Sequence, residues 1–127
     1  MLRTIIIDDE WAGREVLRHM LERFCPEVEL LAMAATAEEG RVAIAALEPD
    51  LVFLDIEMPL QSGFELLDEY PLRKFDVVFA TAHDGYRLES KKYLPADFLL
   101  KPYDVSAVKA ALGKVSPQHL MKARVIR

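Results

Sequence analysis

The hydrophobic residues of the chain gather in short, continuous runs that are separated by segments of helical periodicity. The apolar runs are Leu2–Ile7, Val28–Ala34, Leu51–Leu54, Val77–Ala80 and Phe98–Leu100. Continuous runs of this length, rich in Val, Ile and Phe, are typical of strands buried on both faces of a parallel sheet. The pattern therefore predicts one such strand for each run.

The segments between the runs carry apolar residues at helical spacing. The first stripe consists of Gly13, Val16, Leu17, Met20, Leu21 and Phe24. Shorter stripes occupy residues 40–47, 66–70 and 105–115, and Asp104 is a candidate N-cap for the last of them. The segment 84–94 has the weakest stripe, because charged residues interrupt it.

Strand and helix therefore alternate five times along the chain. This order predicts right-handed crossovers and an α/β fold, with a doubly wound parallel sheet of five strands and five helices. A chain of 127 residues has the size of one domain. Because the pattern stops at Ser116, we expect a folded domain over residues 1–115. Residues 116–127 are then a linker or tail, with Lys122, Arg124 and Arg127 as its charges.

Charge and cysteine content narrow the class of protein. The 16 basic and 21 acidic residues give a net charge of −5, which argues against a surface that binds nucleic acid or anionic membrane as a whole. The single Cys25 cannot form an intrachain disulfide, which fits a reducing compartment. No apolar run approaches the roughly 20 residues of a membrane span. We therefore expect a cytoplasmic protein with no membrane partner.

Polar side chains follow four of the five runs at the point where each predicted strand ends. They are Asp8, Asp9 and Glu10, then Asp55 and Glu57, then Thr81 and His83, and finally Lys101. In a doubly wound sheet, ligands bind outside the carboxyl ends of the strands. Any one of these residues could be a solvated turn residue, but the whole set predicts a shared site.

The chemistry of this set favours a hard cation and phosphate. Clustered carboxylates repel one another unless a cation lies among them, and oxygen ligands that leave room for water suit Mg²⁺. A carboxylate beside Mg²⁺ can act as a nucleophile toward phosphorus and form an aspartyl phosphate. A lysine and a threonine would then bind the phosphoryl oxygens. This reasoning alone does not decide which Asp is the nucleophile.

Four motifs in chain order resemble those of bacterial response regulator receiver domains. They are Ile5-Ile6-Ile7-Asp8-Asp9-Glu10, Leu54-Asp55-Ile56-Glu57-Met58-Pro59 with Gly63, Ala80-Thr81-Ala82, and Lys101-Pro102. The segments 81–86 and 97–102 are most similar to the LytTR (LytR/AlgR) type. The resemblance covers about residues 1–115 and implies a flavodoxin-like sheet with strand order 2-1-3-4-5.

The resemblance assigns roles in a phosphorylation site. It implies that Asp55 is the phosphoacceptor and that Asp8 and Asp9 hold Mg²⁺, with Asp9 as a direct ligand and Asp8 acting largely through water. The family uses the backbone carbonyl at the position of Glu57 as a further metal ligand. The Glu57 side chain would point toward the mouth of the site, and Lys101 would bridge the phosphoryl group and the acceptor.

Further roles follow from the same resemblance. Thr81 matches the switch hydroxyl and Phe98 the switch aromatic residue, and the Lys101–Pro102 peptide bond is expected to be cis. Gly63 would allow a tight entry into the third helix. We expect Trp11 to pack at the start of the first helix. His83, two residues past Thr81, could affect an attacking water, but a surface histidine with no chemical role is favoured.

The resemblance also implies partners. A sensor histidine kinase would donate the phosphoryl group, and DNA would be bound only through a C-terminal output domain outside this chain. A homodimer could form through the fourth helix, fifth strand and fifth helix. Here Ser90, Lys91, Lys92 and Pro95 depart from the more apolar pattern of the LytTR type, so partner choice or dimer geometry could be unusual.

Two other functions compete with a phosphorylation switch. An interaction module that never takes up phosphate leaves Asp55, Thr81 and Lys101 unexplained. An Mg²⁺-dependent phosphohydrolase with an Asp nucleophile on the first strand needs an acid two residues later, which Glu10 supplies for Asp8, but it leaves Asp55 without a role. Nucleotide binding is disfavoured because neither G-x-G-x-x-G nor G-x-x-x-x-G-K-[ST] occurs.

Overall fold

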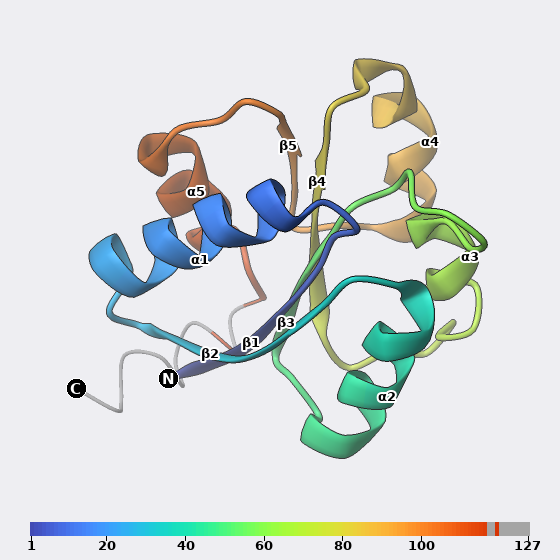
Figure 1. Ribbon diagram of the computed structural model, residues 1–127, viewed down its shortest axis with the longest axis horizontal. Coiled ribbons are helices and arrows are strands. Elements are labelled where there is room, and N and C mark those ends of the chain that lie inside the picture. Colours follow the sequence, from blue (N-terminus) through green and yellow to red (C-terminus); the bar gives the residue numbers. More distant parts are fainter. Residues whose placement is uncertain (117–118, 120–127) are drawn as a thin grey trace.

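The computed structural model describes residues 1–116 and residue 119, and its centre is a five-stranded parallel sheet (Figure 1). The strands are β1 (Leu2–Ile7), β2 (Val28–Ala34), β3 (Leu51–Leu54), β4 (Asp76–Thr81) and β5 (Asp97–Leu100). They lie in the order β2-β1-β3-β4-β5, and every neighbouring pair is parallel. The predicted doubly wound sheet and its strand order are confirmed.

Helices cover both faces of the sheet (Figure 1). They are α1 (Trp11–Phe24), α2 (Ala37–Leu47), α3 (Gly63–Leu67), α4 (Arg87–Ser90) and α5 (Val105–Leu112). One hydrophobic cluster joins the sheet to α1 and α5, and a second joins it to α2 and α3. The molecule therefore has the three layers that alternating strands and helices predict.

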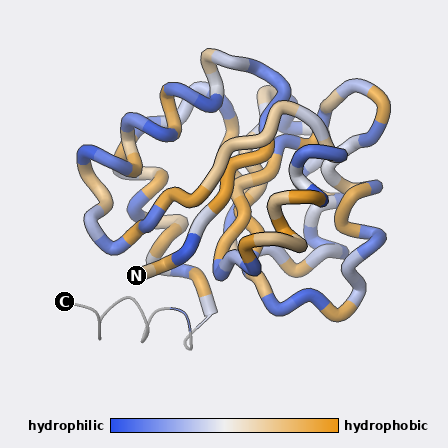
Figure 2. The backbone as a smooth tube through the Cα atoms, turned by 60° about the horizontal axis from the view of Figure 1, so that its bottom comes forward, coloured by the Kyte–Doolittle hydropathy of each residue, from blue (hydrophilic) through white to orange (hydrophobic). Residues whose placement is uncertain are grey.

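Successive side chains of the central strands point to opposite faces of the sheet. Ile5 and Ile7 of β1 lie in the cluster under α2 and α3, whereas Leu2 and Ile6 lie in the cluster under α1 and α5. Figure 2 shows these strands as a hydrophobic centre between more polar helices. The prediction of burial on both faces holds for β1 and β3 and for the apolar residues of β4.

The same prediction is wrong for β2. Only Ala34 of this strand is buried, although its sequence is as apolar as that of the central strands. The cause is position, because β2 lies at the edge of the sheet, with β1 as its one neighbour. An apolar run therefore indicates a strand but not its place in the sheet.

Side-chain caps fix where three helices begin. The Asp104 carboxylate accepts a hydrogen bond from the Ala107 N–H, as predicted, and the Thr36 hydroxyl accepts one from the Glu39 N–H. Ser62 and Glu65 form a reciprocal capping box at the start of α3. Local sequence therefore sets where these helices begin, and each start lies within one helical turn of the first residue of its hydrophobic stripe.

The fourth helix is short and broken. An α-helical turn, α4, is flanked by the 3₁₀ turns η1 (Asp84–Tyr86) and η2 (Lys91–Tyr93), and Leu94 then adopts a left-handed conformation with φ 50°. This agrees with the weak stripe in the sequence, since few apolar residues bind this segment to the core.

The outer face of α1 differs from expectation. Trp11 is 68% exposed, so it does not pack at the helix start, and Val16 is 50% exposed. Leu17 and Leu21 are the buried residues of this helix. The hydrophobic stripe is therefore wider than the face that the sheet covers. No helix among the described residues is long and apolar enough to cross a lipid bilayer.

The segment expected to be a linker lies mostly outside the described residues. Its described members, Ser116 and His119, both bond to Asp76 at the start of β4. The Ser116 N–H and hydroxyl each donate to Asp76 Oδ2 at 2.8 Å, and His119 Nδ1 lies 2.8 Å from the same oxygen. The chain is thus anchored to the sheet just past the predicted domain boundary.

Candidate functional site

Backbone hydrogen bonds extend the sheet one residue past the ends of its strands. The Asp8 N–H donates to Ala34 O at 3.0 Å, and the Asp55 N–H donates to Ile7 O at 2.9 Å. On the other side, the Lys101 N–H donates to Thr81 O at 2.8 Å. These bonds hold the side chains that follow β1, β3 and β5 close together at one edge of the sheet.

Three carboxylates converge at this edge. One oxygen from each of Asp8, Asp9 and Asp55 lies within 4.8 Å of the other two. Asp8 and Asp55 are buried, and Asp9 is partly exposed. This cluster has the hard oxygen donors that Mg²⁺ prefers, with one side open to water.

The pKa of Asp55 reflects this crowding. Burial raises the pKa to about 6, against the opposing effect of the Lys101 ammonium, and the negative charge of Asp8 raises it further. Burial, followed by the charge of Asp8, also raises the pKa of Asp9. The unfavourable energy of these charges would be relieved by a cation among them.

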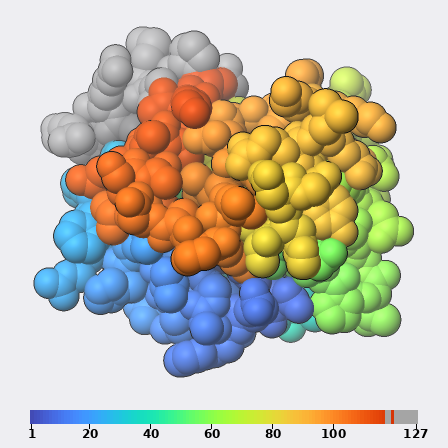
Figure 3. Space-filling view, turned by 90° about the horizontal axis from the view of Figure 1, so that it is seen from above, coloured from blue at the N-terminus to red at the C-terminus, as the bar shows by residue number. Residues whose placement is uncertain are grey.

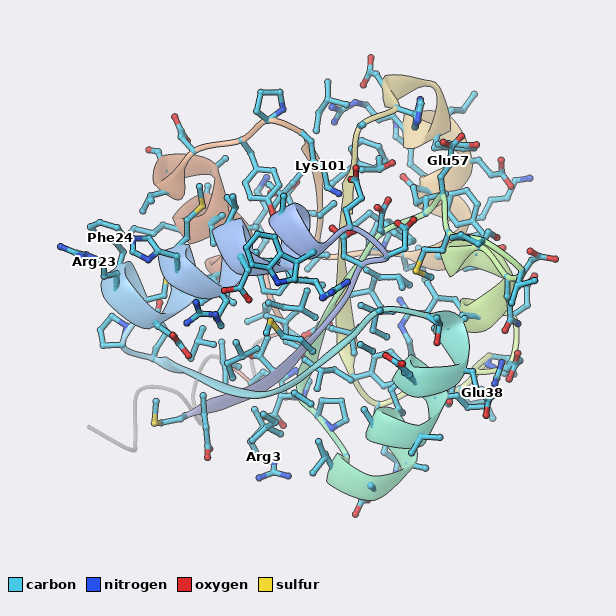
Figure 4. All side chains as sticks on the ribbon, in the orientation of Figure 1. Arg3, Arg23, Phe24, Glu38, Glu57 and Lys101 are labelled. Atoms are coloured by element: carbon cyan, nitrogen blue, oxygen red, sulfur yellow. The ribbon has the colours of Figure 1, made fainter. Side chains whose placement is uncertain are left out.

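Lys101 links the carboxylates. Its Nζ lies 2.7 Å from Asp8 Oδ2, 3.2 Å from Asp55 Oδ2 and 3.1 Å from Glu10 Oε1. Burial by itself would lower the lysine pKa, but its contacts with the carboxylates raise the pKa above its ordinary value. The side chain is therefore an ammonium ion, and Figure 4 shows it at the end of β5. Glu10 joins this group through a contact that its sequence position alone did not specify.

Thr81 and Phe98 lie on the neighbouring strands β4 and β5, and Thr81 stands at the strand end that faces the carboxylates. Thr81 is fully buried, and its hydroxyl oxygen accepts a hydrogen bond from the His83 N–H at 3.5 Å. Phe98 is also buried, and the Arg87 guanidinium of α4 lies over its ring at 4.5 Å from the centroid. The Lys101–Pro102 peptide bond is cis, the isomer that the sequence led us to expect.

Glu57 closes the site on the α4 side (Figure 4). Its carboxylate lies 2.6 Å from His83 Nε2 and accepts a hydrogen bond from the Tyr86 hydroxyl at 2.7 Å. The sequence did not predict this cluster, and it favoured a surface histidine without a chemical role at His83 over an effect on attacking water. The signal was present, since Glu57 and His83 each stand two residues after a proposed site residue, Asp55 or Thr81, on adjacent strands.

A cavity of about 210 Å³ connects these groups. It is lined by Asp9, Glu10, Asp55, Glu57, Thr81, Ala82 and His83. Asp9, Asp55 and Thr81, all predicted from the sequence, thus face one small space, and Lys101 Nζ bonds the Asp55 carboxylate at its side. The space is the right size for a small anion with a metal ion, and too small for a nucleotide.

Two glycines make room for the site. A Cβ on Gly13 would lie 2.5 Å from Asp8 Oδ2, and one on Gly63 would lie 2.3 Å from the Asp55 carbonyl oxygen. Neither glycine has a positive φ. The tight start of α3 that the sequence suggested therefore depends on close approach to Asp55 and not on an unusual backbone conformation.

The fold and these strand-end residues define a known family. Residues 4–113 match the response regulator receiver domain family, and the chain belongs to it. It is 40% identical over 120 residues to an uncharacterized response regulatory protein of Vibrio cholerae, covering 94% of this chain and 50% of that protein. It is 35% identical to the sensory transduction protein LytT of Bacillus cereus, covering 93% and 48%. The chain spans about half the length of these curated relatives.

Solved structures have the same fold. The response regulator TrrA of Thermotoga maritima, crystallised in complex with Mg²⁺-BeF, has a TM-score of 0.79 and 29% identity, covering 91% of this chain and all of that one. The response regulatory domain of mrkE from Klebsiella pneumoniae has a TM-score of 0.82 and 23% identity, covering 93% and 98%. The resemblance to a LytTR-type receiver is confirmed by the family and by LytT.

Proposed function

We propose that this receiver domain accepts a phosphoryl group on Asp55 from a phosphohistidine of a sensor kinase. An Asp55 carboxylate oxygen attacks phosphorus, the P–N bond breaks, and the electron pair of that bond leaves with the imidazole nitrogen. The observation that carries the proposal is the buried Asp55 carboxylate, with the Lys101 ammonium 3.2 Å from its Oδ2. That ammonium can neutralise charge on the phosphoryl oxygens as the new bond forms.

The residues at the site fit Mg²⁺. Asp8, Asp9 and Asp55 would hold the ion, together with the backbone carbonyl of Glu57, and the relative TrrA was crystallised with Mg²⁺. Bound there, the ion would offset the charge of the carboxylates and of the incoming phosphoryl group. The Thr81 hydroxyl would donate a hydrogen bond to a phosphoryl oxygen and so connect the site to β4.

The proposed output is a shift between two arrangements of the α4–β5 face. Thr81 ends β4, and Phe98 on the neighbouring strand β5 contacts Arg87 of α4. We expect movement of Thr81 toward a phosphoryl group to shift β4 against β5, and so to reach Phe98 and Arg87. A charge added at Asp55 would favour one of two states that already exist.

We further propose that the chain acts with an output domain. Relatives such as LytT are about twice as long, and residues 116–127 would then be a linker from receiver domain 1–115 to a LytTR-type DNA-binding domain. The exposed Leu88 and Leu94 near β5 favour a homodimer through α4, β5 and α5. The free and buried Cys25 is in keeping with a cytoplasmic location.

Intact mass spectrometry tests the phosphotransfer. The chain is incubated with Mg²⁺ and the small phosphodonor acetyl phosphate, and we expect one base-labile phosphoryl adduct. Asp55→Asn should abolish the adduct. The matched change Asp84→Asn, at an exposed residue outside the cavity, should leave it intact.

The alternatives predict different outcomes. Equal labelling of Asp55→Asn and the unsubstituted chain would exclude Asp55 as the acceptor. Steady phosphate release that depends on Asp8 would indicate a phosphohydrolase with its nucleophile on β1. A folded chain that binds partners but takes no phosphate would indicate an interaction module.

A further inference from the structure

A second and larger cavity lies beside the phosphorylation site, between α3 and the segment from η1 to η2. Its volume is about 650 Å³. We call it the α3–α4 groove, and its lining residues are Ile56, Glu57, Met58, Pro59, Ser62, Phe64, Glu65, Asp68, Tyr86, Glu89 and Tyr93. Figure 3 shows residues of α4 (yellow to orange) next to those of α3 (green) on this side of the molecule. Its size is within the range of sites for organic ligands and well above what a metal ion needs.

Aromatic rings form one wall of the groove. Phe64 of α3 stacks on Tyr93 with ring centroids 4.9 Å apart and planes 3° apart. Tyr86 meets Phe64 edge to face at 5.8 Å. Phe64 is buried and both tyrosines are half-buried, so the rings are held by the core and present their remaining surface to the groove.

Carboxylates surround these rings. Glu57, Glu65, Asp68 and Glu89 are exposed at the groove, and none of the described residues that line it is basic. The tyrosine hydroxyls point at two of these carboxylates, since Tyr86 donates to Glu57 at 2.7 Å and Tyr93 donates to Asp68 at 2.9 Å. Burial, reinforced by Asp68 and Glu89, raises the pKa of Tyr93 to about 12. The negative charges of these two carboxylates therefore act on the aromatic ring that forms the wall.

We propose that the α3–α4 groove is a docking site for a basic peptide segment of a partner protein, with an arginine side chain against the aromatic wall. A guanidinium plane can stack on Tyr and Phe rings while its N–H groups bond carboxylates, and Asp68 and Glu89 provide these acceptors. Charge complementarity excludes an acidic or phosphorylated peptide, because four carboxylates would repel it.

The inference goes beyond the proposed phosphorylation and does not depend on it. Glu57 belongs to both the groove and the phosphoacceptor cavity. Glu57 contacts His83 and Tyr86. A cation bound in the groove would therefore lie next to a side chain that also lines the proposed phosphorylation site. Docking is nevertheless tested on the unmodified chain, so failure of phosphotransfer and failure of docking give separate results.

Fluorescence anisotropy with a fluorescein-labelled arginine tetrapeptide tests the groove. We expect saturable binding by the chain, and we expect the double change Asp68→Asn with Glu89→Gln to weaken it about tenfold through loss of two charge-assisted contacts. The matched double change Glu29→Gln with Glu48→Gln alters the net charge equally at exposed positions of β2 and the α2 end. It should leave the affinity within about twofold.

NMR amide shifts locate the peptide and identify contrary results. Binding in the groove should perturb the signals of residues 64–68 and 86–93. Equal weakening by both double variants would mean attraction to the acidic surface as a whole and would overturn the proposal. So would an absence of saturable binding by the folded chain, or shifts confined to Asp9 and Asp55 that Mg²⁺ reverses. Thermal unfolding of each variant verifies that it is folded.

Discussion

The absence of a side chain at Gly13 keeps Asp8 and Lys101 in contact. In Gly13→Ala the new Cβ would lie 2.5 Å from Asp8 Oδ2 and 3.2 Å from Lys101 Nζ, so the ion pair must shift. We predict that this variant binds Mg²⁺ about tenfold more weakly, since a small displacement of one ligand misplaces the donor set. Isothermal titration calorimetry measures the affinity.

Gly113→Ala is the matched control. Its nearest neighbour, Ala110 O, would lie at an ordinary 3.4 Å from the new Cβ, so its Mg²⁺ affinity should equal that of the unsubstituted chain. Unchanged Mg²⁺ affinity in Gly13→Ala would contradict the prediction and mean that a shift of the Asp8 carboxylate does not affect metal binding.

Asp76 lies at the start of β4, at the end of the sheet away from the carboxylate cluster, and it couples the stability of the fold to pH. Burial favours a higher pKa, but hydrogen bonds from Ser116 and His119 outweigh it and hold the pKa of Asp76 below its ordinary value of 3.8. A depressed pKa stabilises the fold above the unfolded value, and the contribution is lost as pH falls through the folded value. We predict that Asp76→Asn lowers the free energy of unfolding by about 1–3 kcal/mol at neutral pH.

The pH profile separates this effect from simple loss of packing. Urea unfolding should show the difference between Asp76→Asn and the unsubstituted chain shrinking below about pH 4, where the carboxylate of the unfolded chain becomes protonated. A difference that stays constant down to pH 2 would contradict the assignment to the charged carboxylate. Asp84→Asn, at an exposed residue, serves as the control and should have little effect at any pH.

At the scale of elements, the first residue of α3 is held against the loop that follows β3. The Gly63 N–H donates to Ile56 O at 2.8 Å, and a Cβ there would lie 2.3 Å from the Asp55 carbonyl oxygen. Because the obstacle is backbone, we predict that Gly63→Ala lowers the free energy of unfolding by about 1–3 kcal/mol and slows phosphorylation of Asp55.

Chemical denaturation and a phosphorylation time course measure both effects. Gly85→Ala is the control, since a Cβ there meets nothing within 4 Å, and it should alter stability by less than about 0.5 kcal/mol. A Gly63→Ala chain as stable as the parent would mean that α3 can move away from Asp55 without cost.

Element boundaries differ in how far the sequence specified them. The helix starting after Asp104 was predictable because its cap lies within the same turn. The exposure of β2 was not, because its apolar run matches those of central strands and only the sheet order makes it an edge. The broken segment from η1 to η2 was partly predictable. Its charged residues indicated a weak helix, but they did not indicate the 3₁₀ turns that flank α4.

At the scale of the whole molecule, the carboxylates of Asp8 and Asp9 after β1 and of Asp55 after β3 repel one another. A cation that binds only the folded arrangement should stabilise the whole domain by mass action. We predict that Mg²⁺ at a hundred times its Kd raises the free energy of unfolding by about 2.7 kcal/mol. Thermal unfolding with Mg²⁺ and with excess EDTA measures the change.

Asp9→Asn should remove most of this stabilisation, because it takes one charged ligand from the cluster. Asp84→Asn should preserve it, since that exposed residue does not belong to the cluster. If Mg²⁺ stabilises the Asp9→Asn chain as much as its parent, the ion binds elsewhere on the acidic surface.

The sequence by itself determined the five strands, the alternation with helices and the types of residue at the strand ends. These features are local, because an apolar run or the spacing of a helical stripe depends only on residues close together in the chain. Only the tertiary structure decided which side chains meet. Lys101 and Asp8 are 93 residues apart in the chain, and Tyr86 and Glu57 are 29 apart. The sequence predicted that the strand-end residues gather at one site, but it did not specify which atoms touch. The order of the strands in the sheet brings these particular pairs into contact, and with them it forms the α3–α4 groove.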